Sequence, residues 1–206
     1  MMRPFTMPGL RERKDAEVKR AFFEAAMELF REKGFDGTSV DEIAAKVGYS
    51  RATFFNHFGS KSGVFRYYGH ILAQRVGKLL DGVDPALSPL ERIRQILLSM
   101  AREADARRED LKVVFVHSVN DPDYLMGPTA ARKQIAETVT ALMRESQDQE
   151  LVRTDLPARE LAFHTLSLYH SAVLALVWDL ADAETAMKSA WRFLLTGVTG
   201  ERPATG

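Results

Sequence analysis

The polar side chains between residues 51 and 57 have the types and spacing needed to read the edges of DNA bases. Arg51 presents a fork of donors that matches guanine O6 and N7, a contact worth about 1–3 kcal/mol of discrimination. Asn56 can serve an adenine or a phosphate, while Thr53 and Ala52 can meet a thymine methyl group. At 100° per residue these side chains share one side of a helix, with Arg51 at its margin. The stretch is therefore a candidate for direct base readout.

Neighbouring polar groups can hold backbone phosphates, which fixes register without reading sequence. Ser39, Ser50, His57 and Lys61 are the candidates, and Phe55 lies among them as an apolar contact. Lys61 is expected at the start of a helix, where its charge opposes the helix dipole. A phosphate nearby would reverse the sign of that effect, because exposed amides and an ammonium together form an anion site.

Two short helices joined by a tight turn must position these side chains. Ser39 and Glu42 have the spacing of a capping box, which predicts the start of the first helix. Gly48 is suited to the left-handed residue that ends it. Ser50 can cap the second helix, predicted over residues 51–57. This is the pattern of a helix-turn-helix whose second helix enters a major groove.

A third helix must support this pair, since two helices this short bury too little surface to be stable alone. The spacing of Phe22, Ala26 and Phe30 predicts a helix over residues 15–33, which Gly34 ends.

The run FDGTSVDEIAAKVGYSRATFFNHFGSKSGVF, preceded by AFFEAAMELFREKG, resembles the amino-terminal domain of the TetR (tetracycline-repressor) family. Its matching landmarks cover about fifty residues and are Gly34-Phe35, Thr38-Ser39, Ile43-Ala44, Gly48, Ser50, Thr53, His57-Phe58 and Lys61. The resemblance implies that the residues named above make the family's DNA contacts. Phe55 stands where the family often has tyrosine, so a phenolic bond to phosphate is lost. Asp41 would repel phosphate unless it accepts from a cytosine amine or turns away.

The charge distribution is compatible with a DNA-binding head on an acidic body. The chain of 206 residues has no net charge, yet residues 1–66 hold twelve Lys/Arg against nine Asp/Glu. The remainder carries the compensating negative charge. Such a modest excess fits a protein that touches few phosphates per subunit.

Neither the composition nor the first residues of the sequence indicate a secreted protein. The chain has no cysteine, so disulfides and thiolate metal sites are excluded. The start, MMRPFTMPGL, has no apolar core of a signal peptide, and we expect a cytoplasmic protein by default. Residues 1–14 are predicted to form a flexible basic arm, which could either lie along DNA or be a disordered terminus.

The rest of the chain predicts an all-α body, giving about nine helices with the three-helix head. The expected segments are a helix from Lys61 to about Asp81, one from Pro89, a buried short helix at 110–119, and helices at 129–149, from Pro157, and at 183–198. The predicted domains are 15–75 for DNA binding and 76–200 for effector binding and dimerisation, with a disordered tail at 201–206.

The stretch from Leu161 to Trp178 has no charged residue. Its length touches the threshold for a membrane span, but its histidines, serines and threonine favour a helix buried in protein. A helix that is apolar all round needs a partner surface, most simply a twin subunit, and the resemblance points to dimerisation at the last two helices. The predicted interface residues are Ala172, Ala175, Trp178, Met187, Ala190, Trp191 and Leu194.

The body should hold a small molecule between its helices. The candidate lining residues are Met100, His117, Tyr124, Met143, His164 and Tyr169. Few charges face inward, which favours a mostly apolar effector. The histidines do not form a set with metal-ligand spacing, and we find no nucleophile–base pair or phosphate loop. No cofactor, metal or enzymatic activity is therefore expected.

These observations, with the resemblance, predict a homodimeric, ligand-responsive regulator that binds a pseudo-palindromic DNA operator, most simply as a repressor. Two alternatives stay open at this point. One is a small-molecule carrier whose head no longer recognises DNA specifically, and the other is a helical scaffold without a ligand.

Overall fold

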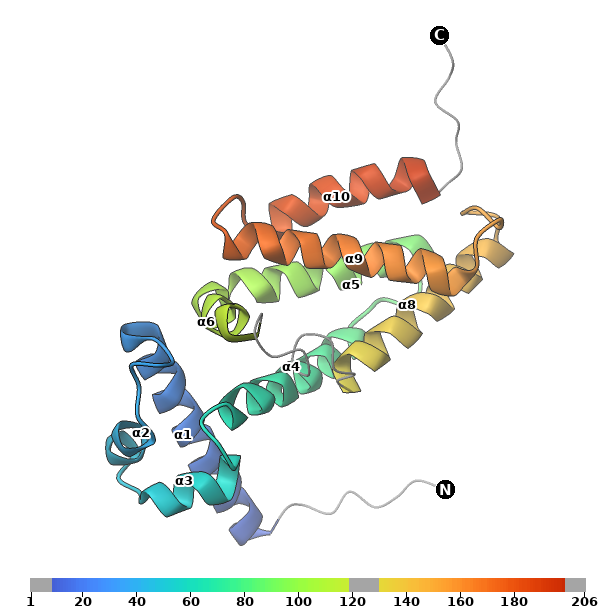
Figure 1. The fold of residues 1–206 in the computed structure, drawn as a ribbon. Coiled ribbons are helices and arrows are strands. Elements are labelled where there is room, and N and C mark those ends of the chain that lie inside the picture. The colour runs from blue at the N-terminus through green and yellow to red at the C-terminus, as the bar shows by residue number, and fades with distance from the viewer. Residues whose placement is uncertain (1–8, 119–129, 199–206) are drawn as a thin grey trace. The chain divides into compact units, whose positions relative to one another are not determined.

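The computed structural model describes residues 9–118 and 130–198 of the chain, and within them it contains helices and no strand (Figure 1). The nine described helices are α1 (Leu10–Lys33), α2 (Val40–Val47), α3 (Arg51–Phe58), α4 (Gly63–Asp81), α5 (Pro89–Asp105), α6 (Arg108–Ser118), α8 (Ala130–Asp148), α9 (Ala158–Val177) and α10 (Ala183–Val198). The predicted all-α class is confirmed.

Contacts divide the chain after Tyr68 into two compact units, here called the head (up to Tyr68) and the body (from Gly69). The predicted boundary after residue 75 lies further along the same helix, α4, which begins in the head and continues into the body.

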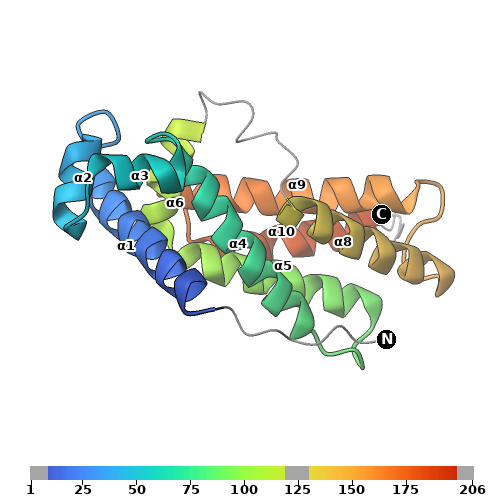
Figure 2. The same ribbon diagram turned by 90° about the horizontal axis from the view of Figure 1, so that it is seen from below.

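Four helices build most of the body. α5 packs against α8, α9 and α10, while α9 packs against α8, α10 and α6 (Figures 1 and 2). The apolar stripe of α5 supplies the fully buried Ile93, Ile96 and Leu97. Met143 of α8 and Leu176 of α9 join the same core cluster. The predicted apolar faces of these helices therefore meet in one core.

Local sequence chemistry sets the start of α5. The Ser88 side chain accepts from the backbone N–H of Glu91, and the Glu91 carboxylate accepts from the backbone N–H of Ser88. Pro89 occupies the first helical position, where its missing N–H would have no partner in any case. The predicted capping box is present.

Several predicted boundaries need correction. α1 begins at Leu10, inside the predicted arm, while residues 1–8 and 199–206 lie outside the described residues. α4 begins at Gly63, two residues after the predicted start, because the N–H groups of Gly63, Val64 and Phe65 donate to carbonyls only three residues earlier, which makes a turn before the regular helix. The Ser60 hydroxyl accepts from the N–H of Gly63, as predicted for a cap. α6 is a helix as predicted, but it is not buried throughout, since Val116 is 63% exposed.

Candidate nucleic-acid interface

A layer of aromatic side chains fixes α3 on the head. Phe22 of α1 is fully buried, and its ring lies 5.5 Å from that of Phe54 and 6.4 Å from that of Phe58, both edge-on. Phe54 and Phe58 stack on one another at 5.1 Å. Because both rings belong to one side of α3, their burial turns the opposite side of the helix outward.

The turn between α2 and α3 has the geometry that its residues predict. Gly48 adopts a left-handed conformation with φ of 75°, and its N–H donates to the carbonyls of Ala44 and Ala45 at the end of α2. The Ser50 side chain accepts from the N–H of Thr53 at 3.1 Å and caps α3. The turn that joins the two helices of the motif therefore has hydrogen bonds that cap the end of α2 and the start of α3.

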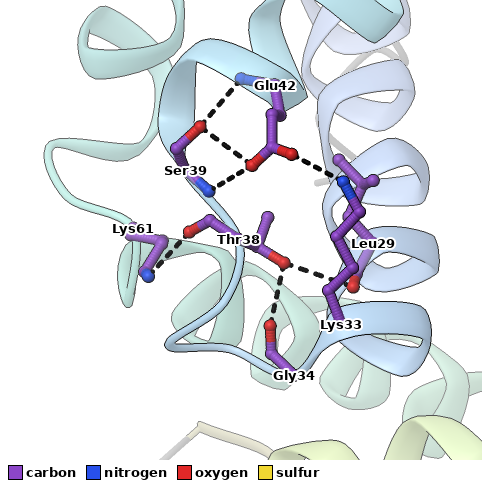
Figure 3. A network of polar contacts seen from close by, with 7 residues as sticks. All are labelled: Leu29, Lys33, Gly34, Thr38, Ser39, Glu42 and Lys61. Atoms are coloured by element: carbon purple, nitrogen blue, oxygen red, sulfur yellow. Dashed lines mark hydrogen bonds and ion pairs between the residues drawn. The ribbon is translucent and has the colours of Figure 1, made fainter.

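The start of α2 is a closed polar network (Figure 3). The Glu42 carboxylate accepts from the backbone N–H of Ser39 at 2.9 Å, and the Ser39 hydroxyl accepts in return from the N–H of Glu42. Lys33 of α1 donates to the same carboxylate at 2.6 Å. The Lys33 hydrogen bond, with those from Ser39, lowers the pKa of Glu42 to about 2. The same carboxylate raises the pKa of Lys33.

Most of the predicted base-reading side chains lie at the surface. Arg51, Ala52 and Asn56 are exposed, and Thr53 is half-buried beside the Ser50 cap. Phe55 is 37% exposed. These residues occupy one outward side of α3, so the structure brings them together as a single surface of polar and apolar groups.

Arg51 is held by two neighbours. Its Nη1 donates to Oδ2 of Asp41 at 2.9 Å, and its guanidinium carbon lies 5.4 Å from the centre of the Phe55 ring. Both charged side chains remain more than half exposed. Asp41 therefore neither turns away nor stands alone, since its carboxylate is paired with the Arg51 guanidinium.

The predicted phosphate contacts differ in their accessibility. Ser39 and Ser50 are exposed. The His57 side chain is only 13% exposed, with its ring 6.1 Å from Phe22 and its Nδ1 3.7 Å from a carboxylate oxygen of Asp15. Lys61 lies in the turn before α4, where its ammonium donates to two backbone carbonyls. His57 and Lys61 are thus engaged within the head.

In the body, the predicted pocket residues do not form one group. Met100 and Met143 are core residues, and Tyr169 packs against that core. Burial, with the nearby carboxylates Glu103 and Asp105, raises the pKa of Tyr169 to about 12, so the phenol stays neutral. His117 is half-buried on α6, whereas Tyr124 lies outside the described residues.

His164 does not belong with the proposed pocket. Its imidazole is 58% exposed and approaches Glu160, one turn earlier in α9, at 3.8 Å. It therefore points outward. Among the described residues, no three His, Cys, Asp or Glu side chains are grouped as a metal site would require.

Several predicted interface residues are core residues of the single chain. Ala172, Met187, Trp191 and Leu194 are at most 7% exposed and belong to the body core. Helical periodicity identified a buried face but not the partner that buries it. Ala175 and Ala190 are half-buried, and Trp178 is 61% exposed. An interface can therefore use the exposed neighbours of these four residues, not the four themselves.

The outward side of α9 is available to a partner. Phe163 is 66% exposed, and Ser167, His170 and Ser171 are exposed further along the helix. Of the described helices, α9 is the one that meets the length and hydropathy of a membrane span. Core helices of soluble proteins meet the same test, and α9 packs against four other helices of the body.

The sequence and the fold are similar to known regulators. Residues 22–68 match the family model described as bacterial regulatory proteins, tetR family. Over 57 residues the chain is 42% identical to the HTH-type transcriptional regulator TcmR of Streptomyces glaucescens, covering 28% of this chain and 25% of that protein. It is 40% identical over 48 residues to the biofilm operon negative regulator IcaR of Staphylococcus aureus, covering 23% and 26%. These matches span only about a quarter of the relatives' length.

Solved structures extend the similarity to the body. FadR of Thermus thermophilus, described as a TetR family transcriptional repressor in complex with lauroyl-CoA, superposes with a TM-score of 0.64 at 27% identity, over 91% of this chain and 99% of that one. SmeT, the repressor of a Stenotrophomonas maltophilia efflux pump, has a TM-score of 0.70 at 17% identity, over 87% and 89%. At 17% identity, the similarity to SmeT concerns the fold alone.

Proposed function

Because the chain belongs to the TetR family of transcriptional regulators, we propose that it is a cytoplasmic, ligand-responsive repressor that binds a DNA operator as a homodimer. The family consists of regulators, not enzymes. The observation that carries the proposal is the outward side of α3, where exposed Arg51, Ala52 and Asn56 stand on a helix held by buried Phe54 and Phe58.

The dimer reads two half-sites. A symmetric pair of α3 helices would enter successive major grooves, about 34–36 Å apart, so the operator is a pseudo-palindrome. Arg51 reads guanine, and its bond to Asp41 leaves two of its nitrogens for the base. Ser39 and Ser50, at the N-termini of α2 and α3, position the backbone phosphates.

The subunits associate through the outward sides of α9 and α10. Phe163 and Trp178 are the large apolar side chains that α9 and its C-cap expose, and Ala175 and Ala190 contribute small half-buried surfaces. The burial of Phe163 and Trp178 supplies the driving force, because large exposed apolar groups are characteristic of interaction sites.

The effector is a molecule with a long apolar portion. Support comes from the apolar core between α5, α8 and α9, and from FadR, whose structure contains lauroyl-CoA. We therefore propose an acyl-chain compound, and a fatty acyl-CoA is the first to test. Met100, Met143 and Tyr169 remain the candidate contacts.

α4 transmits the signal. It runs from the head into the body, where Arg75 forms an ion pair with Glu103 of α5, which also accepts from Arg107 at 2.8 Å. An effector that separates α4 from α5 would alter the spacing of the two α3 helices. The effector acts only through its different affinity for the two states, and a full 1:99 to 99:1 switch needs about 10⁴-fold.

A mobility-shift titration on the DNA upstream of the protein's own gene tests the DNA-binding part. We expect a salt-dependent complex that outcompetes random duplex. Equal affinity for every duplex would instead favour a carrier whose head has lost sequence recognition. The effector part is tested separately by melting temperature with lauroyl-CoA, lauric acid or CoA alone. The proposal expects lauroyl-CoA to stabilise the protein and release DNA, and no response to any of the three would exclude this effector class.

A further inference from the structure

Lys61, in the turn between α3 and α4, contacts the loop that joins α1 to α2, and the proposed function does not explain these contacts. Its Nζ donates to the carbonyl of Phe35 at 2.6 Å and to the carbonyl of Thr38 at 2.8 Å. The same nitrogen lies 4.2 Å from the centre of the Phe35 ring. One ammonium thus contacts the loop between α1 and α2 at three places.

The geometry leaves little of this ammonium for DNA. An ammonium has three donors, two of which are taken by carbonyl oxygens. The ring of Phe35 occupies a further side through a cation–π contact. The side chain is half-buried, whereas Arg51 and Asn56 are exposed. A phosphate contact by Lys61 would be limited to the one remaining donor, or would require one of these two hydrogen bonds to break.

Thr38 shows what the contact holds in place. This residue is 1% exposed, and its hydroxyl lies 3.2 Å from the carbonyl oxygen of Leu29 and 2.8 Å from that of Gly34, at the end of α1 (Figure 3). Its carbonyl accepts from Lys61. Thr38 is therefore hydrogen-bonded through its hydroxyl to the end of α1 and through its carbonyl to Lys61, in the turn before α4. The next residue is Ser39, the cap of α2.

We propose that Lys61 is a positioning residue, which sets the start of α2 against the turn before α4 and so presents Ser39 and the recognition helix to DNA. It does not neutralise a phosphate. This inference rests on the proposed DNA-binding function, but its stability readout does not depend on DNA.

Two substitutions separate positioning from phosphate binding. Lys61→Met removes the charge and keeps the stem, while Lys61→Arg keeps the charge but replaces a compact ammonium by a wide planar fork. A phosphate contact would survive in the Arg variant, because guanidinium binds phosphate well. The contacts with the two carbonyls and the Phe35 ring would be lost in the Arg variant, because their spacing fits a single nitrogen.

We expect both variants to melt about 5 °C lower than the wild type. At a temperature where circular dichroism shows each variant fully folded, operator affinity should fall about ten-fold in both. The slope of log K against log salt should stay within about 0.2 of the wild-type slope, since no phosphate contact is lost. Lys46→Met is the matched control, because that lysine forms an ion pair with Glu28 at 2.8 Å in which both side chains are partly exposed. It should change none of these quantities measurably.

Three results would overturn the inference. A salt slope reduced by about 0.9 per subunit in Lys61→Met, with wild-type behaviour of Lys61→Arg, would identify a phosphate contact. Lower melting temperature with unchanged operator affinity of the folded variant would reduce Lys61 to a stability role. If both variants melted at the wild-type temperature, the contacts of Lys61 would not stabilise the head. If the wild type itself bound no duplex specifically, the DNA-binding proposal would fail while the melting result still stood.

Discussion

Replacing Phe163 by glutamate should dissociate the dimer. Phe163 is 66% exposed on α9 in the single chain. A phenylalanine side chain has roughly 200 Å² of surface, so about 130 Å² is available to a partner. At about 25 cal/mol per Å², burying that area contributes about 3 kcal/mol per copy. A two-fold interface contains two copies, so the substitution removes about 6 kcal/mol, which corresponds to a factor of about 10⁴ in dimer dissociation constant.

Sedimentation velocity over roughly 0.1–100 µM protein measures this effect. A wild type that is dimeric throughout this range should become monomeric over most of it in Phe163→Glu. Val116→Glu is the control, because Val116 is similarly exposed, at 63%, on α6, whose exposed side chains are not part of the proposed interface. It should remain dimeric. A dimer that tolerates glutamate at position 163 as well as at position 116 would place the interface elsewhere.

Three further changes test the head. The folded pKa of Glu42, about 2, lies below its ordinary 4.5, so its stabilising effect is present above pH 4.5 and is lost as the pH falls towards 2. The difference in urea midpoint between wild type and Glu42→Gln should therefore shrink over this range, and a constant difference would contradict it. Gly48→Ala should destabilise the head by about 1–2 kcal/mol in urea unfolding through backbone strain alone, since no atom obstructs the added carbon at φ of 75°; an unchanged midpoint would contradict it. Asp41→Asn should tighten binding to random duplex, by removing a negative charge, while it weakens discrimination at the base read by Arg51. Tighter binding with full discrimination would show that Asp41 does not orient Arg51.

The contacts that sequence reasoning could find are local. Ser39 and Glu42 are three residues apart, so their capping box follows from the residues themselves, and the same holds for Ser88 and Glu91. The left-handed conformation of Gly48 follows equally from its lack of a side chain.

The contacts it missed join distant parts of the chain. Lys61 binds carbonyls 23 and 26 residues away, and no spacing rule marks a backbone oxygen as an acceptor. Asp41 and Arg51 lie ten residues apart on different helices, and only the turn at Gly48 brings them together.

In the body, the sequence pattern predicted which residues are buried but not what buries them. Met187 and Trp191 have the periodicity of a buried face, but periodicity does not distinguish a neighbouring helix of the same chain from one of a partner. His164 lies in the charge-free stretch of α9 that begins at Leu161, which suggested burial. Its ring is nevertheless at the surface, because α9 buries only part of its circumference.

Selection of duplexes from a random pool tests the central claim most directly. The account holds that two α3 helices, presented by a symmetric dimer, read two half-sites. It predicts that the selected sequences are pseudo-palindromes with half-site centres about one helical turn apart. Each duplex should carry two chains, and Arg51→Ala should lose the preference at one symmetric pair of positions. Recovery of sequences without symmetry, or no enrichment over the starting pool, would contradict the account.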